Sequence, residues 1–240
     1  PKLFNTMMDA TRWNAMLGVE TGGDLNEIIS KGKFNDLVLV QEALQEHRIA
    51  DIAEEIAKGG RRFVMIAGPS SSGKTSFSHR LSIQLRTLGK NPHPIALDNY
   101  FVDREHTPID EHGNYNFECL EAIDVELFNQ HLVQLLQGES VQLPVYDFIQ
   151  GKRKPEGPVF RLEPGQPLVI EGIHGLNDRL TFKIPREQKR LIYISALTQL
   201  NLNHSNTILT SDCRLLRRIA RDARTRGHSV QETIKRWPSV

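Results

Sequence analysis

The sequence predicts an α/β protein that is built on a parallel β-sheet with helices on both faces. Short apolar runs alternate with stretches of helical spacing from residue 61 onward. These runs are apolar almost throughout, as expected for strands that are buried on both faces. One of the runs is followed directly by a glycine-containing loop and then by an amphipathic segment. Together these observations predict a parallel sheet that is covered on both faces.

The N-terminal part of the chain is harder to interpret. Residues 1–33 carry scattered apolar residues that are interrupted by glycines, and they predict no clear element. A helix is expected from Asn35 or Asp36 to Lys58, where Gly59 and Gly60 end it. We therefore expect an N-terminal appendage over residues 1–58 and the main domain over residues 61–240.

Strands and helices then alternate along the main domain. Strands are expected at residues 61–67, 93–97, 167–171 and 191–195, and helices at residues 76–88 and 124–137. Between Gln142 and Leu162, prolines and glycines surround two short β-like runs. This segment predicts a β-hairpin or flap that is inserted in the main alternation.

The loop after the first strand fits a phosphate-binding pattern. Gly68-Pro-Ser-Ser-Ser-Gly73-Lys74-Thr75 has the Gly-x4-Gly-Lys-Thr spacing, between a strand and a helix as the chemistry requires. Backbone N–H groups and the helix N-terminus would bind phosphates, Lys74 would reach the β- and γ-phosphates, and the Thr75 hydroxyl would bind Mg²⁺. A chance serine- and glycine-rich turn is disfavoured by the flanking strand and helix. The candidate ATP-binding residues here are Gly68, Ser70, Ser71, Ser72, Gly73, Lys74, Thr75 and Ser76.

Two carboxylates follow strands at the edge of the sheet where ligands bind. Asp98 comes after the second expected strand, and Glu171 ends the third. A phosphoryl-transfer enzyme needs a base that orients the acceptor and an acid near the metal. A single strand-end acid often only caps the next helix. Two such acids at the same edge favour the functional interpretation.

An arginine-rich segment is the third functional candidate. Arg214, Arg217, Arg218, Arg221 and Arg224 fall within about a third of the circumference of a helix, at ~100° per residue. Leu215, Leu216, Ile219, Ala220 and Ala223 fall opposite, so we expect an apolar packing face and a cationic strip. A solvated basic face and a nucleic-acid surface are the alternatives. Beside a triphosphate site, a lid that neutralises the transferring phosphoryl group is favoured.

The bulk composition limits the partners and the compartment. A formal net charge of +1 gives no reason to expect nucleic acid or an anionic membrane as a partner, and no apolar run has membrane-spanning length. Cys119 and Cys213 stand alone, so reduced thiols in a cytoplasm are expected. A homo-oligomer is compatible with the sequence, which does not determine the number of subunits.

Several segments together resemble the uridine kinase and phosphoribulokinase family of phosphate-loop kinases. They are Gly68–Thr75, Asp98–Phe101, Asn116-Phe117, Val141–Phe148, Val169–Ile173 and Arg214–Asp222, in family order. The resemblance implies a kinase that uses ATP and Mg²⁺ to phosphorylate the 5′-hydroxyl of uridine or cytidine. Asp98 matches the base, Glu171 the Mg²⁺-associated acid, and Arg214, Arg217 and Arg221 the lid and phosphate contacts.

The same resemblance implies acceptor contacts, and here the sequence departs from the family. The implied acceptor residues are Asp98, Tyr100, Glu118, Tyr146, Phe148 and Gly151. Glu118 begins a run, Glu-Cys-Leu-Glu, where relatives commonly have Asp-His-Pro-Asp. Gly151 stands where uridine kinases often carry a histidine that reads the pyrimidine, and glycine has no side chain for that hydrogen bond.

With these departures, the segment Phe34–Ala57 and the ending Ile234–Val240, the chain resembles a subgroup of longer bacterial uridine-kinase-like proteins whose N-terminal domains are similar to those of threonyl-tRNA synthetase. The resemblance implies that this chain is the kinase portion of a larger protein, and that the kinase fold continues beyond Val240. Two alternatives stay open: a kinase of the same fold that acts on another alcohol, as phosphoribulokinase or pantothenate kinase does, and a catalytically weak ATP-binding regulatory module. The sequence does not decide between ATP and GTP as donor.

Overall fold

A computed structural model describes residues 2–239, except residues 112, 199, 204, 226 and 228. Contacts divide the chain into two compact units: the first comprises Pro1–Arg48, Ser70–Ser72 and Ser195–Val240, and the second comprises Ile49–Pro69 and Gly73–Ile194. Because these units group segments by contact rather than by chain order, the division into residues 1–58 and 61–240 stays a prediction. Residues 1 and 240 at its ends lie outside the described residues.

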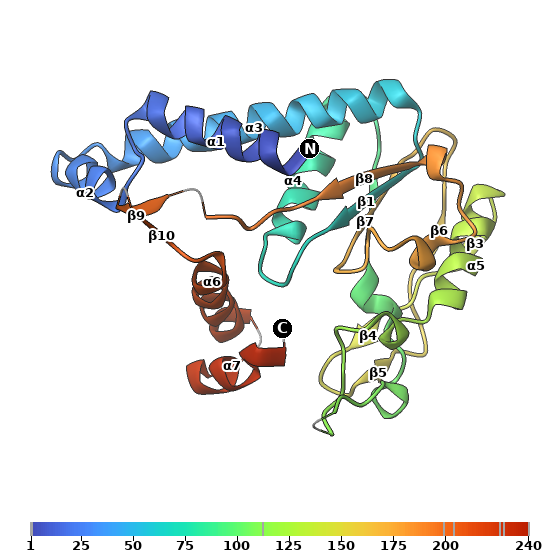
Figure 1. Ribbon diagram of the computed structural model, residues 1–240. Coiled ribbons are helices and arrows are strands. Elements are labelled where there is room, and N and C mark those ends of the chain that lie inside the picture. The colour runs from blue at the N-terminus through green and yellow to red at the C-terminus, as the bar shows by residue number, and fades with distance from the viewer. Residues whose placement is uncertain are drawn as a thin grey trace. The chain divides into compact units, whose positions relative to one another are not determined.

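A four-stranded parallel sheet forms the centre of the second unit (Figure 1). Its strands are β1 (Phe63–Ala67), β2 (His93–Ala96), β7 (Leu168–Glu171) and β8 (Lys189–Tyr193), in the order β2-β7-β1-β8. Each strand begins and ends within two residues of the expected position. The predicted parallel sheet is therefore confirmed.

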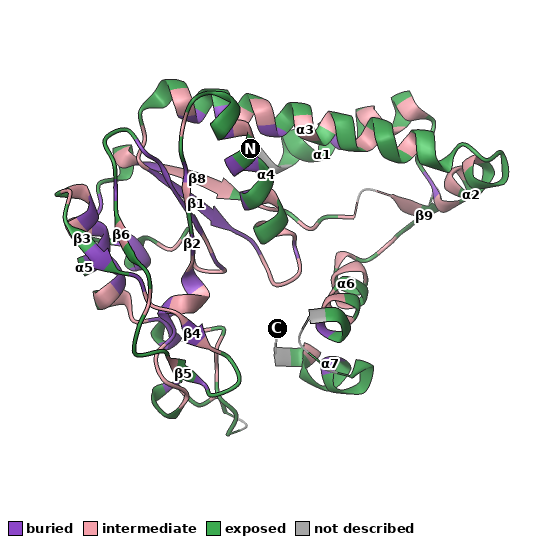
Figure 2. Cartoon of the chain, turned by 180° about the vertical axis from the view of Figure 1, so that it is seen from behind, coloured by how far each residue is buried: buried purple, intermediate pink, exposed green. Residues whose placement is uncertain are grey.

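Helices cover both faces of this sheet because successive residues of each strand point to opposite sides. Phe63 and Met65 of β1 pack in one apolar cluster with α5 (Val125–Leu136). Val64 and Ile66 pack in a second cluster with α4 (Lys74–Thr87) and the second half of α3 (Phe34–Gly59). Figure 2 shows β1 as buried along its length, whereas β8 at the edge of the sheet is mostly intermediate. Burial on both faces explains why β1 is apolar throughout.

The segment expected to form a flap is a pair of nested hairpins. β3 (Ser140–Gln142) pairs antiparallel with β6 (Val159–Arg161). Within the loop between them, β4 (Tyr146–Asp147) pairs antiparallel with β5 (Lys152–Arg153). The expected insertion is confirmed, and its inner hairpin carries Tyr146, Phe148 and Gly151.

The first unit is mostly helical. It contains α1 (Lys2–Leu17), α2 (Gly22–Ser30), the first half of α3, β9 (Asn201–Asn203), β10 (Asn206–Thr207), α6 (Thr210–Thr225) and α7 (Val230–Arg236). The side chain of Trp13 on α1 donates a hydrogen bond to Gln41 on α3 at 3.2 Å. Residues 1–33, for which the sequence predicted no element, thus form two helices. The signal for α2 was present, because Thr21 and Asp24 form a capping box at its start.

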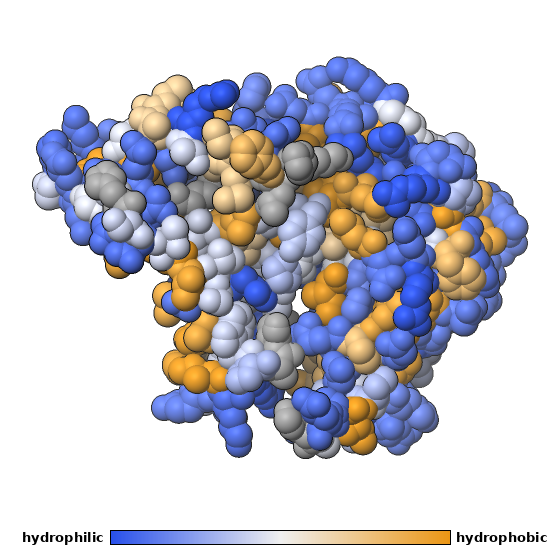
Figure 3. Space-filling view, viewed as in Figure 1, coloured by the Kyte–Doolittle hydropathy of each residue, from blue (hydrophilic) through white to orange (hydrophobic). Residues whose placement is uncertain are grey.

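Short 3₁₀ helices cover Leu97–Tyr100, Arg104–His106, Leu120–Ala122, Asp178–Thr181, Arg186–Gln188 and Trp237–Ser239. The face seen in Figure 3 is mostly hydrophilic, with hydrophobic side chains in scattered groups. Among the residues that the structure describes, no helix combines the length and the apolar character needed to cross a bilayer. Cys119 and Cys213 are both free thiols.

Candidate active site

The phosphate loop links the end of β1 to the start of α4. Ser71 has a φ of 60° and Gly73 a φ of 101°, so both adopt the left-handed conformation that L-residues rarely enter. Gly73 precedes the first residue of α4, Lys74, and makes the turn without a Cβ clash. The unpaired N–H groups at the beginning of α4 are thereby placed at the end of the loop.

Side chains of the loop are arranged for anion binding. The Lys74 ammonium donates hydrogen bonds to the carbonyl oxygens of Gly68 at 2.9 Å and Pro69 at 3.2 Å, so it lies over its own loop. The hydroxyl oxygens of Ser71 and Ser72 are buried and have no hydrogen-bond partner among the described residues. Buried hydroxyls normally have partners, so these two donors fit the oxygens of a bound phosphate.

Oxygen ligands suited to Mg²⁺ meet at the beginning of α4. The Thr75 hydroxyl donates a hydrogen bond to Glu171 Oε1 at 2.6 Å. Strand register fixes this contact, because Glu171 lies beside Ile66 of β1 and beside Ala96 of β2. A hydroxyl and a carboxylate are ligands that Mg²⁺ accepts in proteins. The residues present therefore fit the metal that the sequence predicts.

Electrostatics around Glu171 connect it to the second strand-end acid. Burial raises the pKa of Glu171, and the nearby charge of Asp98 raises it further. The hydrogen bond from Thr75 and the charge of Lys74 oppose this pKa rise. Asp98 lies in the 3₁₀ helix that directly follows β2. The two acids thus share one edge of the sheet, and their catalytic roles stay predictions.

The inner hairpin lies against the segment that carries Asp98. The backbone N–H of Tyr146 donates to Asn99 Oδ1 at 3.2 Å. The ring of Tyr146 contacts Phe101 edge to face at 5.7 Å between centroids, and it contacts Phe148 at 5.2 Å. Phe148 leaves 57% of its surface exposed, whereas Tyr146 is buried. The structure therefore places aromatic surface close to the expected base.

Two of the other acceptor candidates differ in their surroundings. Tyr100 is only 1% exposed and packs in the core, where its hydroxyl shares a hydrogen bond with His131 Nδ1 at 3.1 Å. Burial also raises the pKa of Tyr100. The structure thus contradicts a direct acceptor contact by this side chain. Glu118 is exposed, its backbone N–H donates to Asn116 Oδ1 at 3.0 Å, and its contact with the acceptor stays a prediction.

The arginine-rich segment forms α6, but its buried face is not the expected one. Leu216, Ala220 and Ala223 are exposed, whereas the side chains of Arg218 and Asp222 are only 12% and 4% exposed. Leu215 and Ile219 of the expected apolar face are half-buried, so that face is buried only in part. The buried carboxylate of Asp222 pairs with the guanidinium groups of Arg218 and Arg221 on the same helix.

The contacts of α6 include a residue of the phosphate loop. Arg214 Nε donates to the carbonyl oxygen of Ser70 at 3.1 Å, and Arg218 Nη1 donates to the Ser70 hydroxyl at 3.1 Å. Arg221 pairs with Asp222 at 2.7 Å, and Arg217 is exposed. Arg218 was not among the predicted site residues, although it lies inside the arginine-rich motif. Periodicity alone could not separate it from its neighbours.

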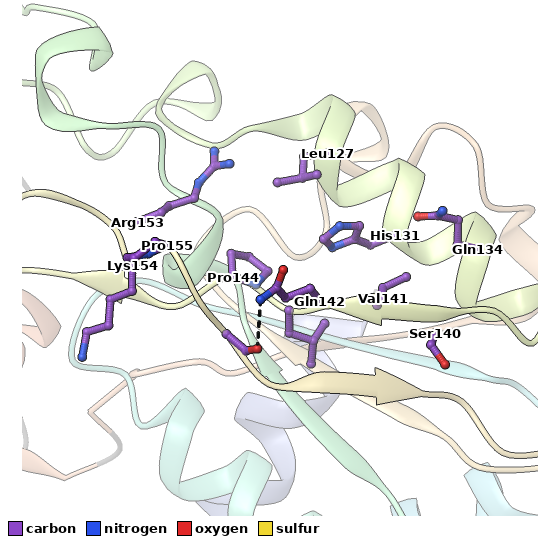
Figure 4. A pocket seen from close by; sticks show the side chains of 12 residues that line it. Leu127, His131, Gln134, Ser140, Val141, Gln142, Pro144, Arg153, Lys154 and Pro155 are labelled. Carbon is purple, nitrogen blue, oxygen red and sulfur yellow. Dashed lines mark hydrogen bonds between the residues drawn. The ribbon is translucent and has the colours of Figure 1, made fainter.

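A cavity of about 360 Å³ lies between α5 and the hairpins (Figure 4). His131 and Gln134 of α5 line it together with Gln142, Arg153 and Lys154 of the hairpin segment. Gln142 Nε2 donates to the carbonyl oxygen of Gly157 at 3.3 Å across the strands (Figure 4). None of the predicted site residues lines this cavity, so it is separate from the phosphate loop.

Comparison with known proteins gives concordant matches. The profile of the phosphoribulokinase/uridine kinase family matches residues 63–240. A uridine kinase from Bacillus pumilus is 32% identical over 175 residues, which cover 73% of this chain and 74% of that protein. A uridine kinase from Chloroflexus aurantiacus is 33% identical over 172 residues, which cover 72% of this chain and 73% of that protein.

A solved structure shares the fold. D-glycerate 3-kinase from Cryptococcus neoformans var. grubii aligns with a TM-score of 0.52 at 14% identity, covering 80% of this chain and 87% of that one. The sheet, the phosphate loop and the strand-end acids define a phosphate-loop kinase fold. The chain belongs to the phosphoribulokinase/uridine kinase family. It is therefore a kinase, a phosphotransferase with an alcohol as acceptor.

Proposed function

We propose that this kinase transfers the γ-phosphoryl group of ATP, with Mg²⁺, to the 5′-hydroxyl of a pyrimidine nucleoside such as uridine or cytidine. The observation that carries the proposal is the hydrogen bond between Thr75 and Glu171 at 2.6 Å, at the sheet edge that Asp98 shares. This hydrogen bond brings together the two candidate Mg²⁺ ligands beside the phosphate loop. Asp98 is then the carboxylate that can act on the acceptor hydroxyl. The names of the matched relatives supply the nucleoside.

On the donor side, the loop residues Gly68 and Ser70–Ser76 bind the phosphates through backbone N–H groups and hydroxyls. Lys74 leaves its loop carbonyls and binds the β- and γ-phosphates. Thr75 and Glu171 would hold the Mg²⁺, which would supply positive charge to the phosphate oxygens. Arg214, Arg217 and Arg221 add positive charge from α6.

On the acceptor side, Asp98 accepts the proton of the attacking hydroxyl as the new oxygen–phosphorus bond forms and ADP leaves. Tyr146 and Phe148 offer aromatic surface to the nucleoside base, and Glu118 can reach ribose hydroxyls. Gly151 contributes backbone rather than a side chain to this region. A small-molecule acceptor and a cytoplasmic location, without nucleic acid or membrane as partners, stay part of the proposal.

A second candidate is the phosphorylation of another alcohol by the same machinery. The observation that favours it is Gly151, because no side chain at this position can read a pyrimidine edge. A regulatory module that only binds ATP is less favoured, because Lys74, Thr75, Asp98 and Glu171 are all present. These residues serve chemistry beyond nucleotide binding alone.

ADP release with a panel of acceptors tests the proposal. Uridine, cytidine, thymidine, ribulose 5-phosphate and pantothenate are compared at one concentration of Mg²⁺ and ATP, with Lys74→Ala as the background control. We expect uridine or cytidine to give the largest stimulation over the acceptor-free rate. Stimulation only by ribulose 5-phosphate or pantothenate would select the second candidate. No stimulation by any of the five would overturn both.

A further inference from the structure

The inner hairpin makes a tight turn at Gly151, and this turn holds an arginine from a distant segment. Gly151 has a φ of +71°, which favours glycine, and its N–H donates to the carbonyl oxygen of Asp147 at 2.7 Å. Its own carbonyl oxygen accepts a hydrogen bond from the backbone N–H of Arg104 at 2.7 Å. The segment that begins at Arg104 is thereby fixed against the turn.

The guanidinium group of Arg104 occupies the space where a side chain at residue 151 would begin. A Cβ atom on Gly151 would lie 2.5 Å from both Cζ and Nε of Arg104, and 2.9 Å from Nη2. Nη2 also donates a hydrogen bond to the carbonyl oxygen of Phe148 at 2.9 Å. A Cβ atom at this position would therefore force the guanidinium to move, and the glycine leaves the space in which Arg104 lies.

The guanidinium has polar and aromatic neighbours but no paired carboxylate. In the described part of the chain, Arg104 forms no ion pair within 4.0 Å. The Tyr146 hydroxyl is buried and has no hydrogen-bond partner among these residues. Burial raises the pKa of Tyr146, and the charge of Arg104 opposes that rise. The exposed ring of Phe148 lies beside Tyr146.

Resting on the acceptor site proposed above, we propose that Arg104 is a specificity-determining residue of that site. Its guanidinium binds an oxygen acceptor at the end of the substrate remote from the reacting hydroxyl, and Gly151 is the residue that makes room for it. A guanidinium offers several N–H donors in a fixed fork, which suits a carbonyl oxygen or an oxyanion. The substrate can thus still be recognised beside Gly151, because the side chain that binds it comes from Arg104 in another segment.

Steady-state kinetics of Arg104→Ala, Gly151→Ala and the double variant test this inference. Acceptors of both kinds are measured: uridine, which presents neutral carbonyl oxygens, and D-glycerate and ribulose 5-phosphate, which present oxyanions. We expect Arg104→Ala to raise the acceptor KM by about 10–100-fold, the range for losing a hydrogen bond to a charged group. The KM for ATP should stay unchanged. Lys152→Ala, on the same hairpin, is the matched control for loss of a positive charge.

The double variant shows whether Gly151 acts through Arg104. Gly151→Ala displaces the guanidinium, so the double variant should be no worse than either single variant, whereas independent roles would multiply the two effects. A loss confined to uridine identifies a carbonyl ligand, and a loss confined to the other two acceptors identifies an oxyanion. The second result would also reject the nucleoside of the proposed function while supporting Arg104.

Titration calorimetry measures the binding of the same three acceptors, so the inference can be tested even with an acceptor that is not phosphorylated. An acceptor KM and affinity unchanged in Arg104→Ala would overturn it, whichever acceptor is used. So would a wild-type protein that binds none of the three. Equal losses in Arg104→Ala and Lys152→Ala would show a general charge effect and would overturn it as well.

Discussion

The phosphate loop and the acceptor hairpin are built in different ways. The binding groups of the loop come from one contiguous motif, in which Lys74 contacts the carbonyl oxygens of Gly68 and Pro69, and distant residues such as Arg214 only add contacts to it. The hairpin depends on distant segments: the backbone N–H of Tyr146 binds Asn99, and the guanidinium of Arg104 lies against Gly151. A contiguous motif therefore specifies the phosphate donor. The acceptor is specified by contacts that only the folded chain assembles.

This difference predicts that substitutions in the loop affect every acceptor alike, whereas those in the hairpin affect acceptors selectively. The largest loss is expected for Lys74→Ala, because it removes the loop's ammonium group. Turnover should fall at least about 100-fold with any acceptor, in the range for losing one electrostatic donor to the transition state. Initial rates measure it, with the exposed Lys33→Ala as control. An equal loss in both variants, or wild-type rates in Lys74→Ala, would contradict the assignment of the loop.

Glu171→Gln should separate stability from activity. Because burial and Asp98 raise the pKa of Glu171, its contribution to stability is fully present below the ordinary pKa and is lost as pH rises through the raised value. Glutamine resembles the protonated acid, so at neutral pH the variant without Mg²⁺ should be at least as stable as the wild type. Mg²⁺-dependent turnover should fall by about 10–100-fold.

Calorimetric melting at pH 7 and turnover over a range of Mg²⁺ concentrations measure these two effects. Wild-type turnover should itself decline as pH falls through the raised pKa of Glu171, because the protonated carboxyl binds Mg²⁺ poorly. A less stable Glu171→Gln protein with wild-type turnover would show a structural role instead. Glu163→Gln, which changes another acid of the same unit, is the control.

Two neighbouring arginines on α6 sharpen the comparison. Arg218 is nearly buried between Ser70 and Asp222, so Arg218→Ala should lower the free energy of unfolding by about 1–3 kcal/mol. Arg217 is exposed, so Arg217→Ala should change stability by less than about 0.5 kcal/mol while it lowers turnover. Urea unfolding and initial rates distinguish the two. The reverse pattern would show that the wrong arginine was assigned to the lid.

The smallest effect is expected for Tyr100→Phe. This change removes one buried hydrogen bond, to His131 Nδ1, and should cost about 1 kcal/mol of stability. The acceptor KM should stay at the wild-type value, because the side chain lies in the core. A raised acceptor KM with unchanged stability would show that the Tyr100 side chain contacts the acceptor.

Much of the sheet could be predicted from the sequence because its strands are short and because the two central strands, β1 and β7, are apolar and buried. Strand-end positions also placed Asp98 and Glu171 at one edge, which follows from parallel topology alone. The side chain of Tyr100 was misplaced because its motif gives sequence position, whereas burial depends on the packing of α5. A residue's place within a matching motif does not tell which way its side chain points.

Other features depend on contacts between distant residues, which periodicity does not contain. The contacts of α6 with Ser70 come from Arg214 and Arg218, and the spacing of its apolar residues does not predict them. Arg104 became a candidate only when the fold placed it against Gly151. The sequence showed that residue 151 has no side chain, and the structure showed that the guanidinium of Arg104 occupies the space beside it.

The most direct test of the account asks whether the loop binds ATP while Asp98 acts only on the acceptor hydroxyl. ATP affinity and acceptor-dependent turnover are measured side by side for wild type, Lys74→Ala and Asp98→Asn. The account predicts that Asp98→Asn binds ATP as the wild type does while turnover falls about 10²–10⁴-fold, the range for losing a positioned base. Lys74→Ala should lose both. Loss of ATP binding in Asp98→Asn, or turnover close to the wild-type value, would contradict the assignment of Asp98 to the acceptor hydroxyl.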